Sequence, residues 1–155
     1  MIYIIEGLDS SGKTTLAHRL AYDLQGCVIS NKRKPKLLEH IHQQVAIANN
    51  VADCMPVVLD RVSLISELVY GQLRTELFTP SCMELIWPDI EATVIYCRLP
   101  FESIKFEGYQ MPGVVENSKK LYDTYDLVME NVAKHHRVVV YDYTTQTYES
   151  LKEIL

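Results

Sequence analysis

The sequence lacks the marks of several large protein classes. Its four cysteines form no C-x-x-C pair, which argues against a zinc site or a disulfide framework. The apolar run Ile2–Ile5 is too short for a signal peptide or a membrane span. Lys and Arg number 15 against 20 Asp and Glu, so a general basic surface for nucleic acid is not expected. We therefore expect a cytoplasmic protein with neither a nucleic-acid nor a membrane partner.

The composition instead predicts one compact domain over residues 1–155. Hydrophobic residues make up 48% of the chain, enough for a sizeable core. There is no internal repeat, low-complexity tract or linker. One local basic run, at residues 32–36, is either a solvated face or a receiver for an anionic substrate.

A glycine-rich stretch from Gly7 to Thr14 fits the P-loop pattern G-x-x-x-x-G-K-[ST] at every fixed position. The run before it predicts a buried strand, and Thr15–Leu24 after it predicts a helix. In such a loop, backbone N–H groups, the helix N-terminus and Lys13 together favour bound phosphates. The Thr14 hydroxyl is placed to hold Mg²⁺. The predicted ATP-binding residues are Gly7, Ser10, Ser11, Gly12, Lys13, Thr14 and Thr15.

Strand-like and helix-like segments alternate along the whole chain. Short continuous runs of Val, Ile and Tyr are typical of strands covered on both faces, as in parallel sheets. The alternation predicts an α/β three-layer sandwich with a five-stranded parallel sheet flanked by helices. The predicted strands are Ile2–Glu6, Cys27–Ser30, Val57–Asp60, Thr93–Cys97 and Val138–Tyr141. The predicted helices are Thr14–Leu24, Pro35–Asn50, Ser63–Leu73, Ser81–Trp87, Phe101–Phe106, Val114–His135 and one beginning at Thr147.

Ligands of open parallel sheets collect at the carboxyl ends of the strands. The third predicted strand ends at Asp60-Arg61, where the acid would orient Mg²⁺ and the arginine would clamp a phosphate. A structural salt bridge is the alternative for this pair. Arg98 ends the fourth strand, where it is either a phosphate contact or an ordinary surface residue. Asp9 adds negative charge inside the P-loop, so it either contacts a sugar hydroxyl or caps the loop backbone.

These residues resemble the thymidylate kinase family of nucleoside monophosphate kinases. The opening from Ile4 to Thr15 is similar to the start of that family, and Asp60-Arg61 is similar to its Asp-Arg element. The compact length and the run Gln110–Asn117 look most like short members encoded by bacteriophages. Further matching elements are Arg33-Lys34-Pro35, Ser66–Gly71, Pro88-Asp89 and Pro100-Phe101-Glu102. The resemblance implies a P-loop kinase fold, Asp9 near a deoxyribose 3′-hydroxyl and Arg33 near an acceptor phosphate.

The sequence departs from that family at the base site. Residues 36–56 contain no Phe or Tyr, so the ring that stacks on the thymine has no obvious counterpart there. Tyr70, Phe78 and Tyr109 are the candidate substitutes. Together with Asp9, Arg33 and Arg61, we count Tyr70 and Gln110 as predicted substrate-binding residues.

A second departure concerns the lid, which we place around residues 105–113. Glycines and a proline mark this stretch as a loop, and its single cation is Lys105 in place of the family's arginines. Arg98 is the first candidate for the cation over the transferred phosphoryl group, and Arg33 is the second. The predicted catalytic residues are Lys13, Arg61, Asp60 and Arg98, with Thr14 and Asp60 as the metal site.

The predicted activity is ATP-dependent phosphorylation of a nucleoside monophosphate, with dTMP or another deoxynucleotide as the first choice, aided by Mg²⁺. A phosphate acceptor needs no strong general base. One alternative is a deoxynucleoside kinase, in which Glu6 or Asp60 would act as the base. A further alternative is an ATP-binding switch or ATPase without an acceptor. The absence of an N-K-x-D motif counts against a GTPase. The partner is a small nucleotide, and the helix around Ile65, Leu68 and Val69 is either a homodimer face or core.

Overall fold

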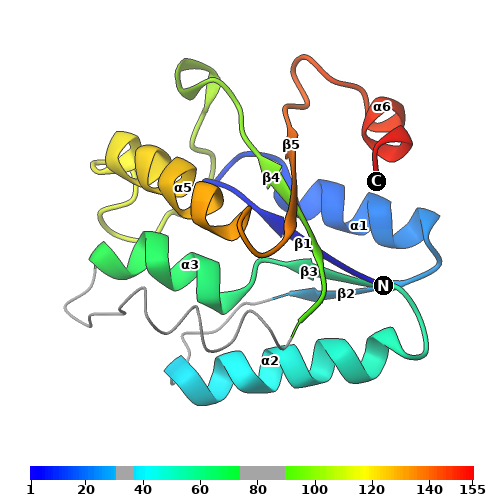
Figure 1. The fold of residues 1–155 in the computed structure, drawn as a ribbon. Helices are drawn as coiled ribbons and strands as arrows, with labels where there is room; N and C mark the ends of the chain where they lie inside the picture. The colour runs from blue at the N-terminus through cyan, green and yellow to red at the C-terminus, as the bar shows by residue number, and fades with distance from the viewer. Residues whose placement is uncertain (31–36, 74–89) are drawn as a thin grey trace.

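Five parallel strands form one sheet in the order β2-β3-β1-β4-β5 (Figure 1). The computed structural model describes residues 1–30, 37–73 and 90–155. The strands are β1 (Ile2–Glu6), β2 (Cys27–Ser30), β3 (Val57–Asp60), β4 (Thr93–Cys97) and β5 (Arg137–Tyr141). The central strand β1 pairs with β3 and with β4, and every pairing in the sheet is parallel. The predicted fold class is confirmed.

Helices cover both faces of the sheet and complete three layers (Figure 1). On one face lie α1 (Lys13–Asp23) and α6 (Tyr148–Glu153). On the other lie α2 (Leu37–Ala52), α3 (Ser63–Tyr70) and α5 (Ser118–Val132). Successive residues of a strand point to opposite faces, so Ile4 packs on the α2–α3–α5 side and Ile5 on the α1 side. Both are fully buried, which explains why β1 is a continuous apolar run.

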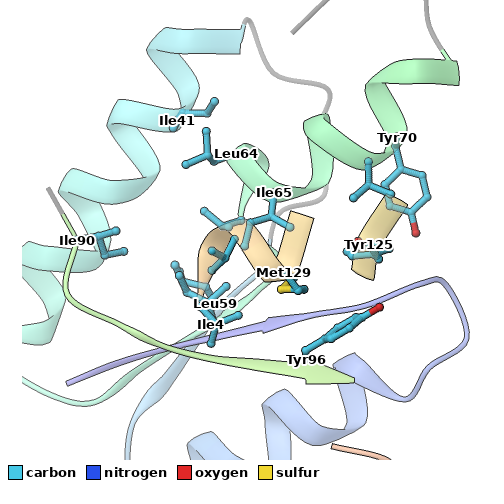
Figure 2. Packing of buried hydrophobic residues seen from close by; sticks show 14 of the residues in the cluster. Ile4, Ile41, Leu59, Leu64, Ile65, Tyr70, Ile90, Tyr96, Tyr125 and Met129 are labelled. Atoms are coloured by element: carbon cyan, nitrogen blue, oxygen red, sulfur yellow. The ribbon is translucent and has the colours of Figure 1, made fainter. Parts of the chain in front are cut away.

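The larger core lies between the sheet and the helices α2, α3 and α5 (Figure 2). Ile41 of α2 faces Leu64 of α3, and Ile65 lies deeper against the sheet. Ile65 and Val69 are both fully buried within the chain itself. Core packing, and not a dimer face, therefore explains these two positions of α3.

Two predicted helices are shorter than the sequence suggested. The segment predicted as helix 101–106 is a single 3₁₀ turn, η3 (Phe101–Ser103), because Ile104 turns to an extended backbone. The helix predicted from Val114 begins only at Ser118 as α5. Gly113 has φ +85°, and the Asn117 side chain donates to its carbonyl at 2.8 Å, which holds a turn there.

Other boundaries agree more closely. The structure ends α3 at Tyr70 and continues it as the 3₁₀ turn η1 (Gly71–Leu73). The predictions for Arg33, Phe78 and a helix at 81–87 lie outside the described residues. Within the described part of the chain, none of the helices is long and apolar enough to cross a membrane.

Candidate functional site

The P-loop joins the carboxyl end of β1 to the start of α1 and is pressed against its neighbours. Gly7 has φ +148°, and a Cβ at this position would lie 2.4 Å from the Cys97 carbonyl oxygen of β4. Gly12 has φ +79°, and a Cβ at this position would lie 3.1 Å from the ring of Tyr143. Gly7 is therefore required by close contact with the backbone of β4 as well as by its own conformation, and Gly12 is favoured by its left-handed backbone.

Lys13 is buried beneath this loop. Its ammonium group donates to the Leu8 carbonyl at 2.5 Å and to the Ser11 hydroxyl at 3.4 Å. Burial, with the nearby Arg61 guanidinium adding to it, lowers the pKa of Lys13 from 10.5 to about 8. An anion bound in the loop would supply the charge partner that this ammonium group needs.

Thr14 and Asp60 meet at the base of the loop. The Thr14 hydroxyl donates to an Asp60 carboxylate oxygen at 2.8 Å, across 46 residues of sequence. Asp60 ends β3, whose register with β1 places Ile5 opposite it. A hydroxyl and a carboxylate are hard oxygen ligands that suit Mg²⁺, which usually takes its remaining ligands from phosphates and water. The residues present therefore fit the predicted metal.

Arg61 directly follows Asp60 and has an unusual backbone. Its φ is +72°, in the left-handed region that costs a non-glycine residue about 1–2 kcal/mol. Its guanidinium forms an ion pair with the Asp9 carboxylate and lies over the ring of Tyr70, 5.1 Å from the centroid. The cation–π contact and the ion pair hold the guanidinium at the loop.

Glu6 forms a buried anchor behind Arg61. One carboxylate oxygen accepts from the Val62 N–H at 2.7 Å and from the Ser66 hydroxyl at 3.4 Å. The other accepts from the Tyr125 hydroxyl at 3.1 Å. Burial raises the pKa of Glu6, while Arg61 and Lys13 oppose that shift. Both oxygens are thus used inside the protein.

A first cleft of about 720 Å³ opens over these groups. It brings together loop residues, the metal pair and the Asp9–Arg61 pair. Its lining comprises Asp9, Ser10, Gly12, Lys13, Thr14, Thr15, Ser30, Asp60, Arg61 and Tyr109. Tyr109, one of the candidate rings, is 90% exposed at this cleft. Most predicted site residues therefore lie in one place.

A second cleft of about 590 Å³ lies on the other side of the same loop and shares Ser10, Gly12 and Thr15 with the first. Three tyrosines line it, two of them from β5 and the loop that follows. Its other lining residues are Leu16, Arg19, Ser103, Lys105, Glu107, Tyr141, Tyr143 and Tyr148. The lid segment reaches the loop here, since the Glu107 N–H donates to the Ser10 hydroxyl at 3.3 Å.

Several predicted residues lie elsewhere. The Arg98 guanidinium forms a two-bond ion pair with Asp126 of α5, at 2.7 and 2.9 Å, and lines neither cleft. Gln110 donates to the Glu107 carbonyl within its own loop. Gly7 and Ser11 are buried residues of the loop itself, and neither lines either cleft.

Tyr70 also differs from its predicted role. It is 4% exposed, and its ring packs edge-on against Tyr125 of α5 in the core (Figure 2). Burial raises the pKa of Tyr70 to about 12. The ring lies under the Arg61 guanidinium and not in the cleft, so Tyr70 supports the arginine and is not placed to stack on a base.

Sequence reasoning missed most of the second cleft. The strand-end rule favours ionisable groups that phosphate chemistry could use, and it therefore passes over the end of β5, where Tyr141, Asp142 and Tyr143 lie. The signal that could have found this cleft is aromatic rather than charged. Gln44 was also missed, because both of its partners are distant in the sequence. Arg61 follows the end of β3, and Ser63 begins α3.

No protein-family model matches the sequence, and neither does any curated protein. Solved structures do match. YorR from Bacillus subtilis, in complex with phosphorylated GDP, is 21% identical with a TM-score of 0.74, over 99% of this chain and 93% of that chain. Deoxyadenosine kinase from M. mycoides is 14% identical with a TM-score of 0.64, over 99% of this chain and 96% of that chain.

Thymidylate kinase from Candida albicans is 16% identical with a TM-score of 0.62, over 99% of this chain and 89% of that chain. At these identities the matches establish a shared architecture. The chain has the fold of P-loop kinases of nucleosides and nucleotides.

Proposed function

We propose that this protein is a nucleotide kinase that transfers the γ-phosphoryl group of ATP to a nucleoside monophosphate, with dTMP or another deoxynucleotide as the preferred acceptor. The observation that carries the proposal is the pair of clefts meeting at one phosphate-binding loop. A two-substrate kinase needs a donor site and an acceptor site on either side of the transferred group. The similar solved structures include kinases of both nucleosides and nucleotides.

The donor fits the second cleft. The phosphates of ATP would lie on the loop N–H groups and on Lys13, which lines the first cleft, and the adenine ring would extend into the second cleft toward Tyr143 and Tyr148. Lys105 is exposed at the same cleft and is the lid's own cation. The lid around 105–113 is therefore proposed to close over the donor.

The acceptor fits the first cleft, where Arg61 offers two parallel N–H donors to its phosphate. Asp9, the partner of Arg61, is proposed to contact the sugar. Tyr109 is the exposed ring available to the acceptor base. Arg98 does not enter this proposal, because Asp126 holds its guanidinium.

The positions of the acids favour a phosphate acceptor over a nucleoside hydroxyl. A hydroxyl acceptor needs a general base, and Glu6 is fully buried with both oxygens bonded inside the protein. The two carboxylates that line the first cleft are engaged, Asp60 by Thr14 and Asp9 by Arg61. An acceptor phosphate is already ionised and needs no such base.

The chain's residues would act through position and charge. Lys13 would bridge the β- and γ-phosphates, and Arg61 would hold the acceptor phosphate against its repulsion from ATP. Thr14 and Asp60 would hold Mg²⁺, which neutralises the charge on the phosphate oxygens. The acceptor oxygen forms a bond to the γ-phosphorus as the bond to the β,γ-bridging oxygen breaks, so ADP leaves and a diphosphate is the product.

The test offers purified protein Mg-ATP with each nucleoside and each (deoxy)nucleoside monophosphate, and separates the phosphorylated products by chromatography. A diphosphate formed from a monophosphate supports the proposal. A monophosphate formed from a nucleoside would instead assign a deoxynucleoside kinase. ATP consumption with no phosphorylated acceptor would assign a switch or ATPase. A homodimer and a cytoplasmic location, in the host if the chain is phage-encoded, stay predictions.

A further inference from the structure

Arg61 is held from several directions by buried groups. Its N–H donates to the Ile5 carbonyl of β1 at 3.1 Å. Its carbonyl accepts from the side-chain amide of Gln44 at 3.1 Å. The next N–H, of Val62, donates to the Glu6 carboxylate. A left-handed arginine persists only where the surroundings over-determine it, and these contacts do so.

Gln44 makes two of the contacts that fix this turn. Its Nε2 donates to the Arg61 carbonyl, and its Oε1 accepts from the Ser63 N–H at 3.0 Å. Gln44 is only 6% exposed, in a helix whose neighbouring residues pack in the core. An amide is the side-chain group that offers a donor and an acceptor side by side, so it can span residues 61 and 63 while leaving no buried polar group unpaired.

The packing of α2 against α3 sets the position of this amide. Ile41, one turn before Gln44, faces Leu64, the residue after Ser63 (Figure 2). The helix contact thus brings the amide to the strand end where Arg61 leaves β3. The side chain of Arg61 reaches the first cleft from this fixed backbone.

We propose that Gln44 is a positioning residue for the reaction: by bridging the Arg61 carbonyl and the Ser63 N–H, it holds Arg61 in the left-handed conformation that aims its guanidinium at the acceptor phosphate. This inference rests on the proposed function, because it assigns Gln44 a role through Arg61. Loss of the bridge frees the Arg61 carbonyl and lets the backbone relax toward right-handed conformations. The guanidinium then leaves the cleft for part of the time.

The kinetic test uses Gln44→Leu, with dTMP as the acceptor probe or whichever monophosphate the wild type phosphorylates best. We expect kcat/KM for the acceptor to fall about tenfold or more while KM for ATP stays within about twofold. Val45→Ala is the matched control, since Val45 is the next residue of α2, is about as buried as Gln44, and has an aliphatic side chain that cannot hydrogen-bond the Arg61 carbonyl. Equal acceptor losses in both variants would overturn the proposal.

A double-mutant cycle separates positioning from general stability. In an Arg61→Ala background, adding Gln44→Leu should reduce acceptor kcat/KM by no more than about twofold, because the group that Gln44 positions is already gone. A purely structural role would give the same loss in both backgrounds and would contradict the proposal.

An NMR measurement tests whether Gln44 holds Arg61 in place, without an activity assay. The Nε–H signal of Arg61 in a nitrogen-labelled NMR spectrum is assigned from its absence in Arg61→Lys. We expect it to be sharp in the wild type and in Val45→Ala, and broadened or shifted in Gln44→Leu. An unchanged signal in Gln44→Leu would refute the positioning role. If the wild type phosphorylates no monophosphate, the proposed function fails, and this comparison still decides whether Gln44 holds Arg61.

Discussion

Lys13 is proposed to bind the phosphates of ATP, and burying its positive charge lowers the stability of the folded protein. Its pKa is lowered from 10.5 to about 8, so its burial with a positive charge is unfavourable at neutral pH. A shift of this size corresponds to at most about 3 kcal/mol. Between pH 8 and 10.5 the unfolded chain holds more protons at this site than the folded one, so this cost shrinks as the pH rises.

Replacing Lys13 with Met should therefore separate function from stability. We expect Lys13→Met to abolish turnover and, at pH 7, to raise the free energy of unfolding by about 1–3 kcal/mol. Chromatographic assay and thermal unfolding measure the two effects. Lys134→Met is the control, because Lys134 is exposed and lines neither cleft, and it should change neither quantity. A Lys13→Met protein that is less stable than the wild type would contradict this account.

Arg61 shows what single-residue reasoning could and could not predict. The Asp60-Arg61 pair was predicted at a strand end because ionisable residues directly follow an apolar run. Its left-handed backbone was not predictable, because the contacts that enforce it come from Ile5, Glu6 and Gln44. The ion pair of Arg98 was not predictable for a related reason: the sequence near β4 gives no sign that Asp126 of α5 will hold its guanidinium.

At the scale of elements, strands were predicted more accurately than helices. The three inner strands β3, β1 and β4 are short runs buried on both faces, and the edge strands β2 and β5 are short apolar runs that are partly exposed, so in each the pattern is local. The start of α5 was predicted four residues early, since the apolar pattern there continues through a turn set by Gly113 and Asn117. The P-loop was predictable from sequence alone because its glycines and lysine stand at fixed spacing between a strand and a helix.

The contact between the P-loop and β4 should make Gly7 the position of the site that is least tolerant of substitution. Gly7→Ala would place a Cβ 2.4 Å from the Cys97 carbonyl, a backbone atom that cannot rotate away. We expect a loss of about 3 kcal/mol or more of stability, together with loss of ATP binding. Gly108→Ala is the control: φ is +70° there too, but nothing lies within 4 Å, so the loss should be about 1–2 kcal/mol.

Denaturant unfolding of the two variants and the wild type measures this difference. The outcome that would contradict our account is an equal loss of stability in Gly7→Ala and Gly108→Ala. That result would mean that backbone conformation alone, and not the contact with β4, requires glycine in the loop.

For the whole molecule, donor binding should be visible as stabilisation. At an Mg-ATP concentration about 100-fold above Kd, binding adds about 2.7 kcal/mol, which for this size of protein raises Tm by about 5–10 °C. Bound phosphates favour charged Lys13, whereas above its pKa of about 8 the free protein holds it neutral. ATP must then bind together with a proton, so affinity falls as pH rises through 8.

We therefore expect the binding free energy of Mg-ATP to be weaker at pH 9 than at pH 7 by up to about 1.4 kcal/mol. The rise in Tm that Mg-ATP induces should be correspondingly smaller at pH 9. Differential scanning fluorimetry at both pH values, with Lys13→Met in parallel, measures this. The variant should show little stabilisation at either pH. A wild-type shift that is the same at both pH values would show that Lys13 does not set the pH dependence.

The sheet order has a consequence for how the chain becomes a working protein. The strand that carries the phosphate loop, β1, is central, yet its partners β3 and β4 begin only at Val57 and Thr93. During synthesis β1 therefore leaves the ribosome long before either neighbouring strand has been made, and until then both of its edges have no strand partner. Nascent chains that stop short of Thr93 would expose one edge of β1 to chaperones. The second cleft, which includes Tyr148, can form only after most of the chain has been made.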